Sequence, residues 1–491
     1  MRRILIVAAF RLAVALPVLI LTADAALAQR PRGDYRGLEQ VVRAELKESN
    51  TPGAAVAVVR GDRVVYAKGF GVASVETGAP VTPDTLFRVG SVTKMLTAAV
   101  FVSLAEEKGI ALDAPVGESI KGLGPRLSRV TPRQLLSHTA GVIDYARVCC
   151  AQEESGLVAQ VRSQKDDDYF FSEPGRIFSY SNPSYIVAGY AVEQLTGRPY
   201  ADAMEARLFR PLGMARTTFR PTVAMTFPLS QGHDASGAGR PTVVRPAVNN
   251  VGDWPAGFAY SNVYDLARFA AAFMNGGRAD GKQVLSPSVI ATLSTPYVEV
   301  PFSWDIPPGL YEGARYGHGL FIQEHRGVRL LHHGGVINGF GAFVLLAPAH
   351  RVAVIVLANR TGSILGRSLE KAMELSLPLK PKRPAARRRA LAMTPAEMES
   401  YAGTYANGLL RVELSVRGGK LFRKDFYPPT AEEGPGRSFE VKVEKVGANR
   451  FAFTPPGETA PAEFVIVPGE GGRPEYLHSF MGAARRVEAA R

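Results

Sequence analysis

The sequence predicts an α+β protein: an antiparallel sheet flanked by helices and joined to a helical lobe, followed by a small all-β barrel. Three observations indicate this fold class. β-like runs lie near both ends of residues 29–375, helical patterns dominate residues 131–285 between them, and short β-like runs follow closely on one another in residues 394–491. A stretch rich in Pro, Lys and Arg at residues 376–393 separates the two β-containing regions, and we expect it to be a linker.

The first expected element of the sheet is a hairpin at residues 53–74, because two β-rich runs flank an Arg-Gly-Asp turn at residues 60–62. Ser91–Lys108 is expected to form a helix that ends before Gly109. Its apolar residues surround much of its circumference, so it belongs inside a domain. An antiparallel meander is expected to follow, from β-like runs at residues 316–323, 328–333, 341–347 and 352–358.

The C-terminal region is expected to be a small barrel or sandwich, because its β-like runs are short and closely spaced over about 100 residues. These runs lie at residues 401–405, 410–416, 418–422, 439–446, 450–454 and 463–467. Of the two forms, the barrel is the prediction that we carry forward.

Residues 1–28 are predicted to be a secretory signal peptide. Three arginines flank the start of an apolar run at residues 12–21, and an Ala-Leu-Ala sequence ends at Ala28, just before the expected cleavage point. The run is about half as long as the roughly 20 residues that span a bilayer, so a membrane anchor is disfavoured. We therefore expect a periplasmic or secreted protein without a stable membrane anchor.

The chain has 491 residues, of which 46% are hydrophobic and 21% charged, a balance that excludes collagen, coiled coil and wholesale disorder. Its net charge of +13 would suit a nucleic-acid partner. However, much of the excess lies in the signal peptide and in the linker, where it is solvated. We therefore expect no nucleic-acid partner.

Neither a metal nor another cofactor is expected. The two cysteines, Cys149 and Cys150, are adjacent, and a bond between neighbours strains the backbone, so two thiols are favoured over an oxidised pair. Asp166–Asp168 lacks the glycine and the distal glutamate of a calcium loop, and is interpreted as a polar loop. Five histidines show no metal-ligand spacing, and these are His233, His318, His325, His350 and His478.

Three short motifs carry the candidate chemistry. Ser91 and Lys94 occupy helical positions i and i+3, so the lysine can lie beside the serine hydroxyl and activate it as a nucleophile. Tyr180 and Asn182 can project the same way from an irregular turn. A His-Gly-Gly sequence at residues 333–335 ends a β-like run, where glycine lets a substrate approach the backbone closely. Each motif alone is weak, but the three in this order are far more specific.

With these motifs, residues 35–375 resemble the superfamily of serine β-lactamases and penicillin-binding proteins. The resemblance is nearest to the class C β-lactamase-like branch, which also holds D-alanyl-D-alanine carboxypeptidases, D-aminopeptidases and esterases. It is carried by residues 83–94, 112–116, 135–141, 180–182, 211–214 and 333–340. The C-terminal region is similar to the lipocalin-like modules that follow some such hydrolases.

The resemblance implies that these residues form an acyl-enzyme. Ser91 would attack a carbonyl carbon while Lys94 and Tyr180 share the proton transfers. Asn182 would hold the substrate amide and orient Lys94. The backbone N–H groups of Ser91 and Val336 would form the oxyanion hole, and water would then release the acyl group.

The sequence departs from the β-lactamase pattern at His333, which with Gly334 and Gly335 replaces Lys-Thr-Gly. A lysine is a permanent cation suited to a substrate carboxylate, whereas a histidine is mostly neutral at pH 7. We therefore expect His333 and Gly335 to bind a small ester or peptide, which the cell wall could supply, with weak or no β-lactamase activity. The expected activity is that of a serine esterase or a D-amino-acid peptidase. The alternative is a non-catalytic cell-wall or protein-binding module that keeps the hydrolase fold, and oligomerisation through the C-terminal domain stays open.

A second Tyr-Ser-Asn sequence, at residues 260–262, is a rival to the first. It directly precedes an amphipathic pattern at residues 263–275, and the spacing of Asn262 and Asp265 matches a helix N-terminal cap. The structural interpretation is therefore favoured for this copy.

Three aromatic or imidazole side chains are also considered. His138 is expected to make a structural hydrogen bond in its loop. His332 should point to the opposite face of the strand from His333, because side chains alternate along a strand. Trp304 could line a cleft or anchor an exposed loop.

Overall fold

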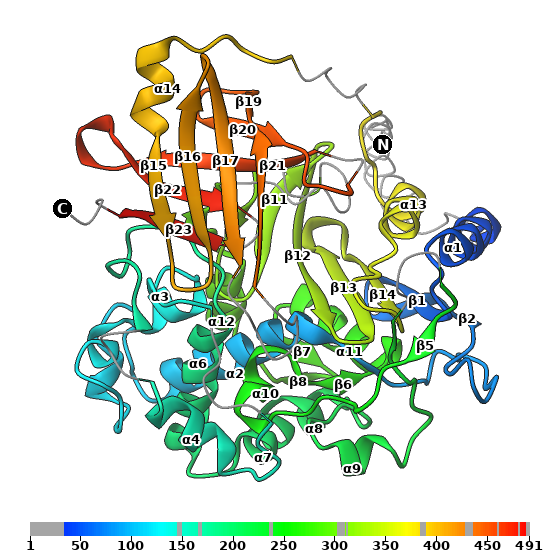
Figure 1. Ribbon diagram of the computed structural model, residues 1–491. Helices are drawn as coiled ribbons and strands as arrows, with labels where there is room; N and C mark the ends of the chain where they lie inside the picture. The colour runs from blue at the N-terminus through cyan, green and yellow to red at the C-terminus, as the bar shows by residue number, and fades with distance from the viewer. Residues whose placement is uncertain are drawn as a thin grey trace, which may run out of the picture.

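The computed structural model describes residues 34–144, 150–164, 169–234, 239–301, 310, 313–382, 389–427, 436–458, 461–479 and 482–487. It consists of a mixed region of helices and sheet, followed by a C-terminal sheet that is nearly closed into a barrel (Figure 1). The predicted fold class is confirmed. Residues 1–33, with the predicted signal peptide, lie outside the described residues.

An eight-stranded antiparallel sheet forms the centre of the mixed region. Its strands are β1 (Gly53–Arg60), β2 (Arg63–Gly71), β9 (Val298–Glu299), β10 (Arg315–Tyr316), β11 (Phe321–His325), β12 (Val328–Ile337), β13 (Phe340–Ala347) and β14 (Val352–Ala358). Their order across the sheet is β2-β1-β14-β13-β12-β11-β10-β9. The predicted hairpin is β1 and β2, with Gly61 at φ 64° in its turn. Because β1 also pairs with β14, Ala54 opposite Ala358, the sheet joins the two ends of the mixed region.

The central sheet is buried on both faces, and alternate residues of β1 enter two different cores. Val56 belongs to one core, together with residues of α1 (Arg36–Glu48) and α13 (Gly366–Ser376). Ala57 belongs to the other core, on the side where α11 (Val263–Met274) packs against β1 and β14. Helices therefore cover the sheet from both sides (Figure 1).

Helices dominate the middle of the mixed region, as predicted. The helix expected at Ser91–Lys108 starts as a 3-10 turn at Gly90–Val92 and continues as α2 (Thr93–Glu107), which packs against α6 (Asn182–Thr196) and α10 (Trp254–Gly257). The other helices are α3 (Pro132–Leu136), α4 (Gly156–Arg162), α7 (Tyr200–Met204), α8 (Arg210–Leu212), α9 (Pro221–Ala224) and α12 (Pro287–Ser294). Three short strand pairs accompany them: β3 (Phe87–Arg88) with β6 (Tyr260–Ser261), β4 (His233–Asp234) with β5 (Thr242–Val243), and β7 (Arg278–Ala279) with β8 (Lys282–Gln283).

The C-terminal region begins with α14 (Pro395–Tyr401) and continues as a nine-stranded antiparallel sheet. Its strands are β15 (Gly403–Ala406), β16 (Arg411–Arg417), β17 (Lys420–Tyr427), β18 (Arg437–Lys442), β19 (Glu444–Lys445), β20 (Arg450–Phe453), β21 (Ala462–Pro468), β22 (Pro474–Ser479) and β23 (Gly482–Val487). The order is β18-β17-β16-β15-β23-β22-β21-β20-β19. Only Val443 separates the two outermost strands along the chain, so the sheet is nearly closed. The predicted barrel is confirmed.

The barrel lies against the mixed region through its β22–β23 hairpin. The hydroxyls of Tyr476 and Ser172 are 2.7 Å apart, and His478 Nε2 donates to the carbonyl oxygen of Phe178 at 2.8 Å. The backbone N–H of Ala483 donates to Ser179 Oγ at 3.2 Å. The hairpin thus contacts the segment that immediately precedes Tyr180.

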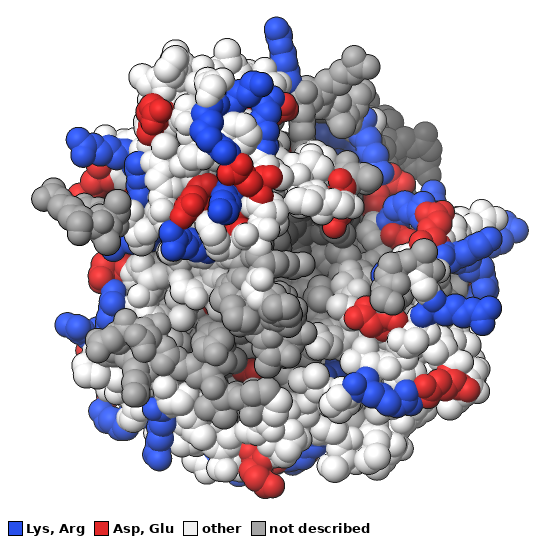
Figure 2. All heavy atoms as spheres, viewed as in Figure 1, with Lys and Arg blue, Asp and Glu red and all other residues white. Residues whose placement is uncertain are grey.

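Charged side chains are mixed in sign on the face of the molecule that Figure 2 shows. Lysines and arginines there alternate with aspartates and glutamates and do not merge into one basic patch. The expectation that nucleic acid is not a partner stays a prediction. Among the described residues, no helix is both long enough and apolar enough to cross a membrane.

The prediction of two free thiols is wrong. Cys150 takes part in a disulfide. The sequence holds only one other cysteine, Cys149, which lies outside the described residues. Cys150 has φ 66°, in the sparsely populated left-handed region, so the backbone accepts the strain that made two thiols the favoured prediction.

Candidate active site

The candidate nucleophile Ser91 lies in the 3-10 turn that leads into α2. Gly90 before it has φ 52°, a conformation that favours glycine, and a Cβ there would lie 2.7 Å from the backbone nitrogen of Val336. The hydroxyl of Thr93 donates to the carbonyl oxygen of Gly90 at 2.7 Å, which fixes the turn. Ser91 is thereby presented between the start of a buried helix and strand β12.

Lys94 follows one turn later, and its side chain is completely buried. Its Nζ lies 3.0 Å from Ser91 Oγ, 2.7 Å from Asn182 Oδ1 and 2.6 Å from the carbonyl oxygen of Ala256. Burial lowers the pKa of Lys94 to about 7, although the carboxylates of Asp144 and Asp253 oppose this shift. A substantial fraction of Lys94 is therefore a neutral amine at physiological pH.

Two of the oxygens around Lys94 can only accept hydrogen bonds, and these are the amide oxygen of Asn182 and the carbonyl oxygen of Ala256. A neutral amine has two N–H groups, which these oxygens engage. Its lone pair is then left for the third neighbour, the hydroxyl of Ser91. The geometry therefore aims the basic electron pair of Lys94 at the proton of Ser91.

Tyr180 and Asn182 reach the same place from the start of α6. Lys94 Nζ is 4.8 Å from the centre of the Tyr180 ring, and Asn182 accepts a hydrogen bond from Lys94. The side chain of Ser181 between them caps α6 by accepting from the backbone N–H of Ser184 at 3.3 Å. The cap makes Asn182 the first residue of the helix, which places its side chain beside Lys94.

Strand β12 brings the third predicted motif to Ser91. A Cβ on Gly335 would lie 2.0 Å from the carbonyl oxygen of Val89 and 3.0 Å from the backbone nitrogen of Ser91, so only glycine allows this approach. The backbone nitrogens of Ser91 and Val336 are consequently neighbours at the helix start, where positive charge accumulates. The side chain of Val336 is 55% exposed beside them.

His333 is buried on the same side of β12 as Tyr180, with ring centroids 6.1 Å apart. Its Nε2 lies 3.0 Å from the hydroxyl of Tyr316 and its Nδ1 lies 2.6 Å from the carbonyl oxygen of Gly334. Burial, followed by the charge of Lys94, lowers the pKa of His333 to about 3, so its imidazole is neutral at pH 7. His333 therefore provides no cation for a substrate carboxylate.

His138 makes the structural hydrogen bond that was predicted. Its Nδ1 accepts from the backbone N–H of Ser181 at 3.0 Å, and its ring centroid is 4.3 Å from that of Tyr180. Burial lowers its pKa well below the usual value, with Lys94 and His333 contributing further. His138 is thus a neutral support for the Tyr180 segment.

The other sequence interpretations can be placed in the same way. Asn262 Oδ1 accepts from the backbone N–H of Asp265 at 2.8 Å and caps α11, so the structural interpretation of the second Tyr-Ser-Asn sequence is confirmed. His332 stacks between Phe321 and Phe343, with ring centroids 5.6 and 5.3 Å away. Trp304 and Asp166–Asp168 lie outside the described residues. Within the described part of the chain, no cluster of three or more His, Cys, Asp or Glu side chains could hold a metal ion.

Sequence reasoning missed two groups that contact the site. Asp144 accepts from the backbone N–H of Asn182 at 2.7 Å, and the carbonyl oxygen of Ala256 holds Lys94. Asp144 follows three residues after the Leu-Leu-Ser-His-Thr-Ala-Gly motif, and this proximity is a signal that could have found it. Ala256 contributes only its backbone, so its side chain gives no signal.

The fold and the cluster around Ser91 are those of a β-lactamase-like and transpeptidase-like protein. The chain belongs to the β-lactamase family, whose model matches residues 38–375.

Two curated relatives support this assignment. The chain is 31% identical over 340 residues to unguisins hydrolase ungD' of Aspergillus campestris, a match that covers 66% of this chain and 61% of that protein. It is 29% identical over 320 residues to penicillin-binding protein 4 of Amycolatopsis lactamdurans, covering 64% of this chain and 82% of that protein. The match to the hydrolase thus spans less than two thirds of its length. Both alignments are limited to part of this chain.

Solved structures extend the similarity. The crystal structure of SurE has a TM-score of 0.71 and 26% identity, covering 92% of this chain and 98% of SurE. A structure of SurE with D-Leu has a TM-score of 0.66 and 25% identity over 92% of this chain and 99% of that one. The octameric penicillin-binding protein homologue from Pyrococcus abyssi shares the fold, with a TM-score of 0.62 and 23% identity over 92% of this chain and 99% of the homologue.

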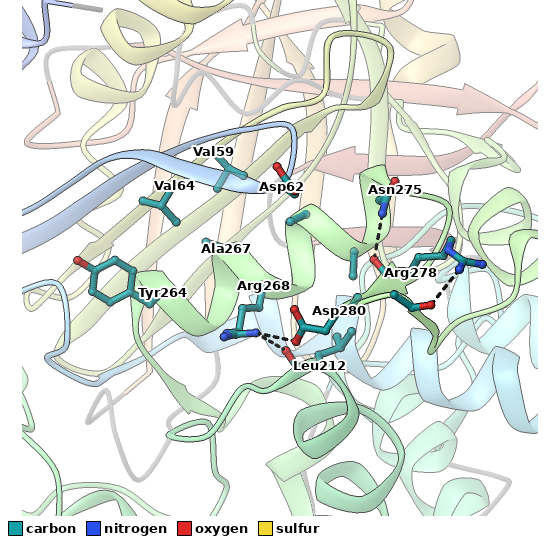
Figure 3. Close-up of a pocket in the computed structure, with 14 residues that line it drawn as sticks. Val59, Asp62, Val64, Leu212, Tyr264, Ala267, Arg268, Asn275, Arg278 and Asp280 are labelled. Carbon is teal, nitrogen blue, oxygen red and sulfur yellow. Dashed lines mark hydrogen bonds and ion pairs between the residues drawn. The ribbon is translucent and has the colours of Figure 1, made fainter. Parts of the chain in front are cut away.

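A separate surface hollow of about 550 Å³ lies between the β1–β2 hairpin and α11 (Figure 3). Tyr264, Val64 and the Arg268–Asp280 ion pair line it, and the ion pair measures 3.4 Å. None of the residues that line this hollow belongs to the candidate active site.

Proposed function

We propose that this chain is an exported serine hydrolase that cleaves an ester or amide bond through an acyl-enzyme on Ser91. One observation carries the proposal: the buried amine of Lys94, held by two acceptor-only oxygens, lies 3.0 Å from Ser91 Oγ. A serine becomes a competent nucleophile when a base within hydrogen-bond reach takes its proton. Lys94 meets both requirements, because it is within reach and its pKa is about 7.

In the acylation step, Ser91 Oγ bonds to the substrate carbonyl carbon while neutral Lys94 takes the hydroxyl proton. The carbonyl oxygen becomes an oxyanion, which the backbone N–H groups of Ser91 and Val336 stabilise. The bond from the carbon to the leaving group then breaks. The leaving alcohol or amine receives a proton through Tyr180 and Lys94, which regenerates the neutral amine. In the second half of the reaction, water adds to the acyl carbon and gives a proton to Lys94. The bond to Ser91 Oγ then breaks, this oxygen takes the proton back, and the carboxylic acid leaves.

The proposed substrate is a short acyl ester or a D-amino-acid peptide, and β-lactam hydrolysis is weak or absent. Neutral His333 supports this choice, because the substrate carboxylate that Lys-Thr-Gly sites hold would find no cation in its place. Two similar proteins support the same choice: one is a hydrolase of unguisins, and SurE has been crystallised with D-Leu.

Export is proposed from the charged and apolar pattern of residues 1–28. Expression of the full chain in a bacterial host should yield a periplasmic protein whose first residue is Gln29. Intact mass and N-terminal sequencing measure this directly. Cytoplasmic protein with an uncleaved N-terminus would contradict the proposal of export and leave the proposal of hydrolysis untouched.

Labelling by a fluorophosphonate probe tests the nucleophile, because such probes bond covalently to activated serines. Wild-type protein should be labelled and Ser91→Ala should not. Ser103→Ala is the matched control, because this serine lies on α2, nine residues after Lys94. Labelling that persists in Ser91→Ala would place the reactive serine elsewhere. Failure to label wild-type protein would favour the alternative, a non-catalytic binding module that keeps the hydrolase fold.

A substrate panel tests the proposed specificity. Short p-nitrophenyl esters, D-Ala-D-Ala peptides, peptides with an N-terminal D-amino acid and a chromogenic cephalosporin are compared on wild type and Ser91→Ala. Esters or D-amino-acid peptides should have the highest kcat/KM, and Ser91→Ala should lose about 10⁴-fold or more on each. A cephalosporin that dominates the panel would overturn the assignment of substrate.

A further inference from the structure

Asp144 is a carboxylate beside the candidate active site that the proposed chemistry does not use. It lies in the segment after α3, at the start of which His138 supports Tyr180. Burial raises the pKa of Asp144, against the lowering effects of the hydrogen bond from Asn182 and of the charge of Lys94. A part-buried carboxylate costs free energy unless its oxygens accept hydrogen bonds, so the partners of Asp144 indicate its role.

The contacts of Asp144 point to Asn182. Asp144 Oδ1 accepts the backbone N–H of Asn182 at 2.7 Å, and Oδ2 lies 3.5 Å from Asn182 Nδ2. One carboxylate therefore faces both the backbone and the side-chain amide of the same residue. It fixes the first residue of α6 at the point where the helix meets Lys94.

These contacts fix the orientation of the Asn182 side-chain amide, that is, which of its oxygen and nitrogen atoms faces Lys94. Its Nδ2 can only donate and is turned toward the carboxylate, so its Oδ1 is turned toward Lys94, at 2.7 Å. If the amide were reversed, its NH2 group would face the amine of Lys94, which would lose an acceptor. The lone pair of Lys94 would then no longer be directed at Ser91.

Asp144 also acts on Lys94 through charge. Two carboxylates favour the protonated form of Lys94, and Asp144 has the larger effect of the two, followed by Asp253. Tyr185, whose ring lies 5.5 Å from Nζ, is neutral because burial raises its pKa, and the buried imidazoles of His138 and His333 are neutral because burial lowers theirs. The ring of Tyr180 lies 4.8 Å from Nζ. Asp144 is thus linked to Lys94 by charge and, through Asn182, by geometry.

We propose that Asp144 is a positioning residue for the reaction, which orients the amide of Asn182 and thereby directs the Lys94 amine at Ser91. The proposal rests on the proposed function of Ser91 and Lys94. It predicts that Asp144 sets both how fast Ser91 reacts and at which pH it becomes reactive. A carboxylate that served only to stabilise the loop would set neither.

The test measures the rate constant of fluorophosphonate labelling between pH 5 and 9, which needs no knowledge of the natural substrate. Three variants are compared with wild type: Asp144→Asn, Asp144→Ala and Asp253→Asn. Asp144→Asn removes the charge and keeps an oxygen that can accept from the Asn182 backbone. Asp144→Ala removes both, and Asp253→Asn removes a charge near Lys94 without touching Asn182.

Loss of a nearby negative charge disfavours the Lys94 cation, so the rise of labelling with pH should move to lower pH by about 1 unit in both Asp144 variants. The plateau at high pH should fall about 10-fold or more in Asp144→Ala, recover at least partly in Asp144→Asn, and stay within about 2-fold of wild type in Asp253→Asn. Circular dichroism and Tm separate these effects from misfolding.

Unchanged plateaus and an unchanged pH of half-maximal labelling in both Asp144 variants would overturn the proposal. So would an equal loss in Asp144→Asn and Asp144→Ala without any shift in pH, because that pattern indicates a merely structural residue. If wild-type protein is not labelled through Ser91 at all, the proposed function fails first, and this outcome is distinct from the other two.

Discussion

At the scale of the residue, the proposed chemistry depends on the buried amine of Lys94. A lysine ordinarily keeps its proton up to about pH 10, and it loses it near pH 7 here because burial penalises the cation. The reactive form is the deprotonated one. Activity should therefore appear as the pH rises through the pKa of Lys94.

We predict that kcat/KM for a short acyl ester rises about tenfold per pH unit below the pKa of Lys94 and levels off above about pH 7. The measurement is a pH–rate profile at substrate concentrations well below KM. Titration of His333 cannot cause the rise in kcat/KM toward pH 7, because its pKa is about 3. A profile that is flat from pH 5 to pH 8 would contradict the role of Lys94 as the base.

Gly335→Ala provides a second test at the residue scale. The added Cβ would lie 2.0 Å from the carbonyl oxygen of Val89, so β12 must move away from Ser91 and the two backbone nitrogens separate. We expect kcat/KM to fall about 100-fold or more, the cost of losing one oxyanion donor. Gly37→Ala is the control, because its Cβ would meet only the Cε of Lys371 at 3.5 Å and activity should be retained. Full activity in Gly335→Ala would exclude Val336 from the oxyanion hole.

The pairing of Ser91 with Lys94 was predictable because one helical turn brings these residues together, whatever the rest of the chain does. The contributions of Asp144 and Ala256 were not. They depend on contacts with Asn182 and Lys94 across 38 and 162 residues of chain, which only the tertiary fold creates. A backbone carbonyl such as that of Ala256 also carries no signature in the sequence.

At the scale of elements, the Tyr-Ser-Asn sequence occurs twice, each time at the start of a helix, and plays a different role in each place. The Tyr-Ser-Asn sequence at residues 180–182 begins α6 with Ser181 as the cap and leaves Asn182 free to contact Lys94. The copy at residues 260–262 begins α11 with Asn262 itself as the cap. A shift of one residue in the position of the cap separates a site residue from a structural one.

Asn262→Ala should therefore weaken the fold, and Asn182→Ala should weaken the chemistry. Loss of a helix cap costs about 1 kcal/mol, so Tm should fall by about 2 °C in Asn262→Ala while the labelling rate per folded molecule is retained. In Asn182→Ala the labelling rate should fall at least about 10-fold. Differential scanning fluorimetry measures Tm, and probe kinetics measure the labelling rate. A slower labelling rate in Asn262→Ala together with an unchanged labelling rate in Asn182→Ala would refute these two roles.

The strands of the central sheet were predictable because their apolar runs are long and separated by turn residues. The last two strands of the barrel were not. β22 begins at Pro474, and β23 includes Arg485 and Arg486, so neither has a clean apolar alternation. The run predicted at residues 439–446 is instead two strands, β18 and β19, because Val443 interrupts the pairing at the open seam of the barrel.

At the scale of the whole molecule, the barrel is attached by more than a linker. Hydrogen bonds from Tyr476, His478 and Ala483 reach the segment before Tyr180, and Ile177 packs with Tyr476 and Ala483. The barrel therefore contacts residues 172–179, the segment that leads into the predicted active-site residue Tyr180.

We expect tryptic cleavage at Arg387–Arg389 to leave the two pieces associated, so that they elute together in gel filtration. The double variant Tyr476→Phe/His478→Ala removes two of the interface hydrogen bonds and should let the nicked pieces separate more readily. Arg417→Ala, on a barrel strand and exposed, is the control and should behave as wild type. Immediate separation of the wild-type pieces would mean that the interface contributes little to their association.

The pairing of β1 with β14 also governs how the chain can fold as it is made. Ala54 and Ala358, which face each other, are about 300 residues apart, and synthesis at 5–20 residues per second separates them by about 15–60 s. During that time the hairpin exists with one edge unpaired and with apolar residues on both faces of β1. We therefore expect the edge of β1 to stay unpaired until β14 has been made, and such long-range pairing favours slow folding.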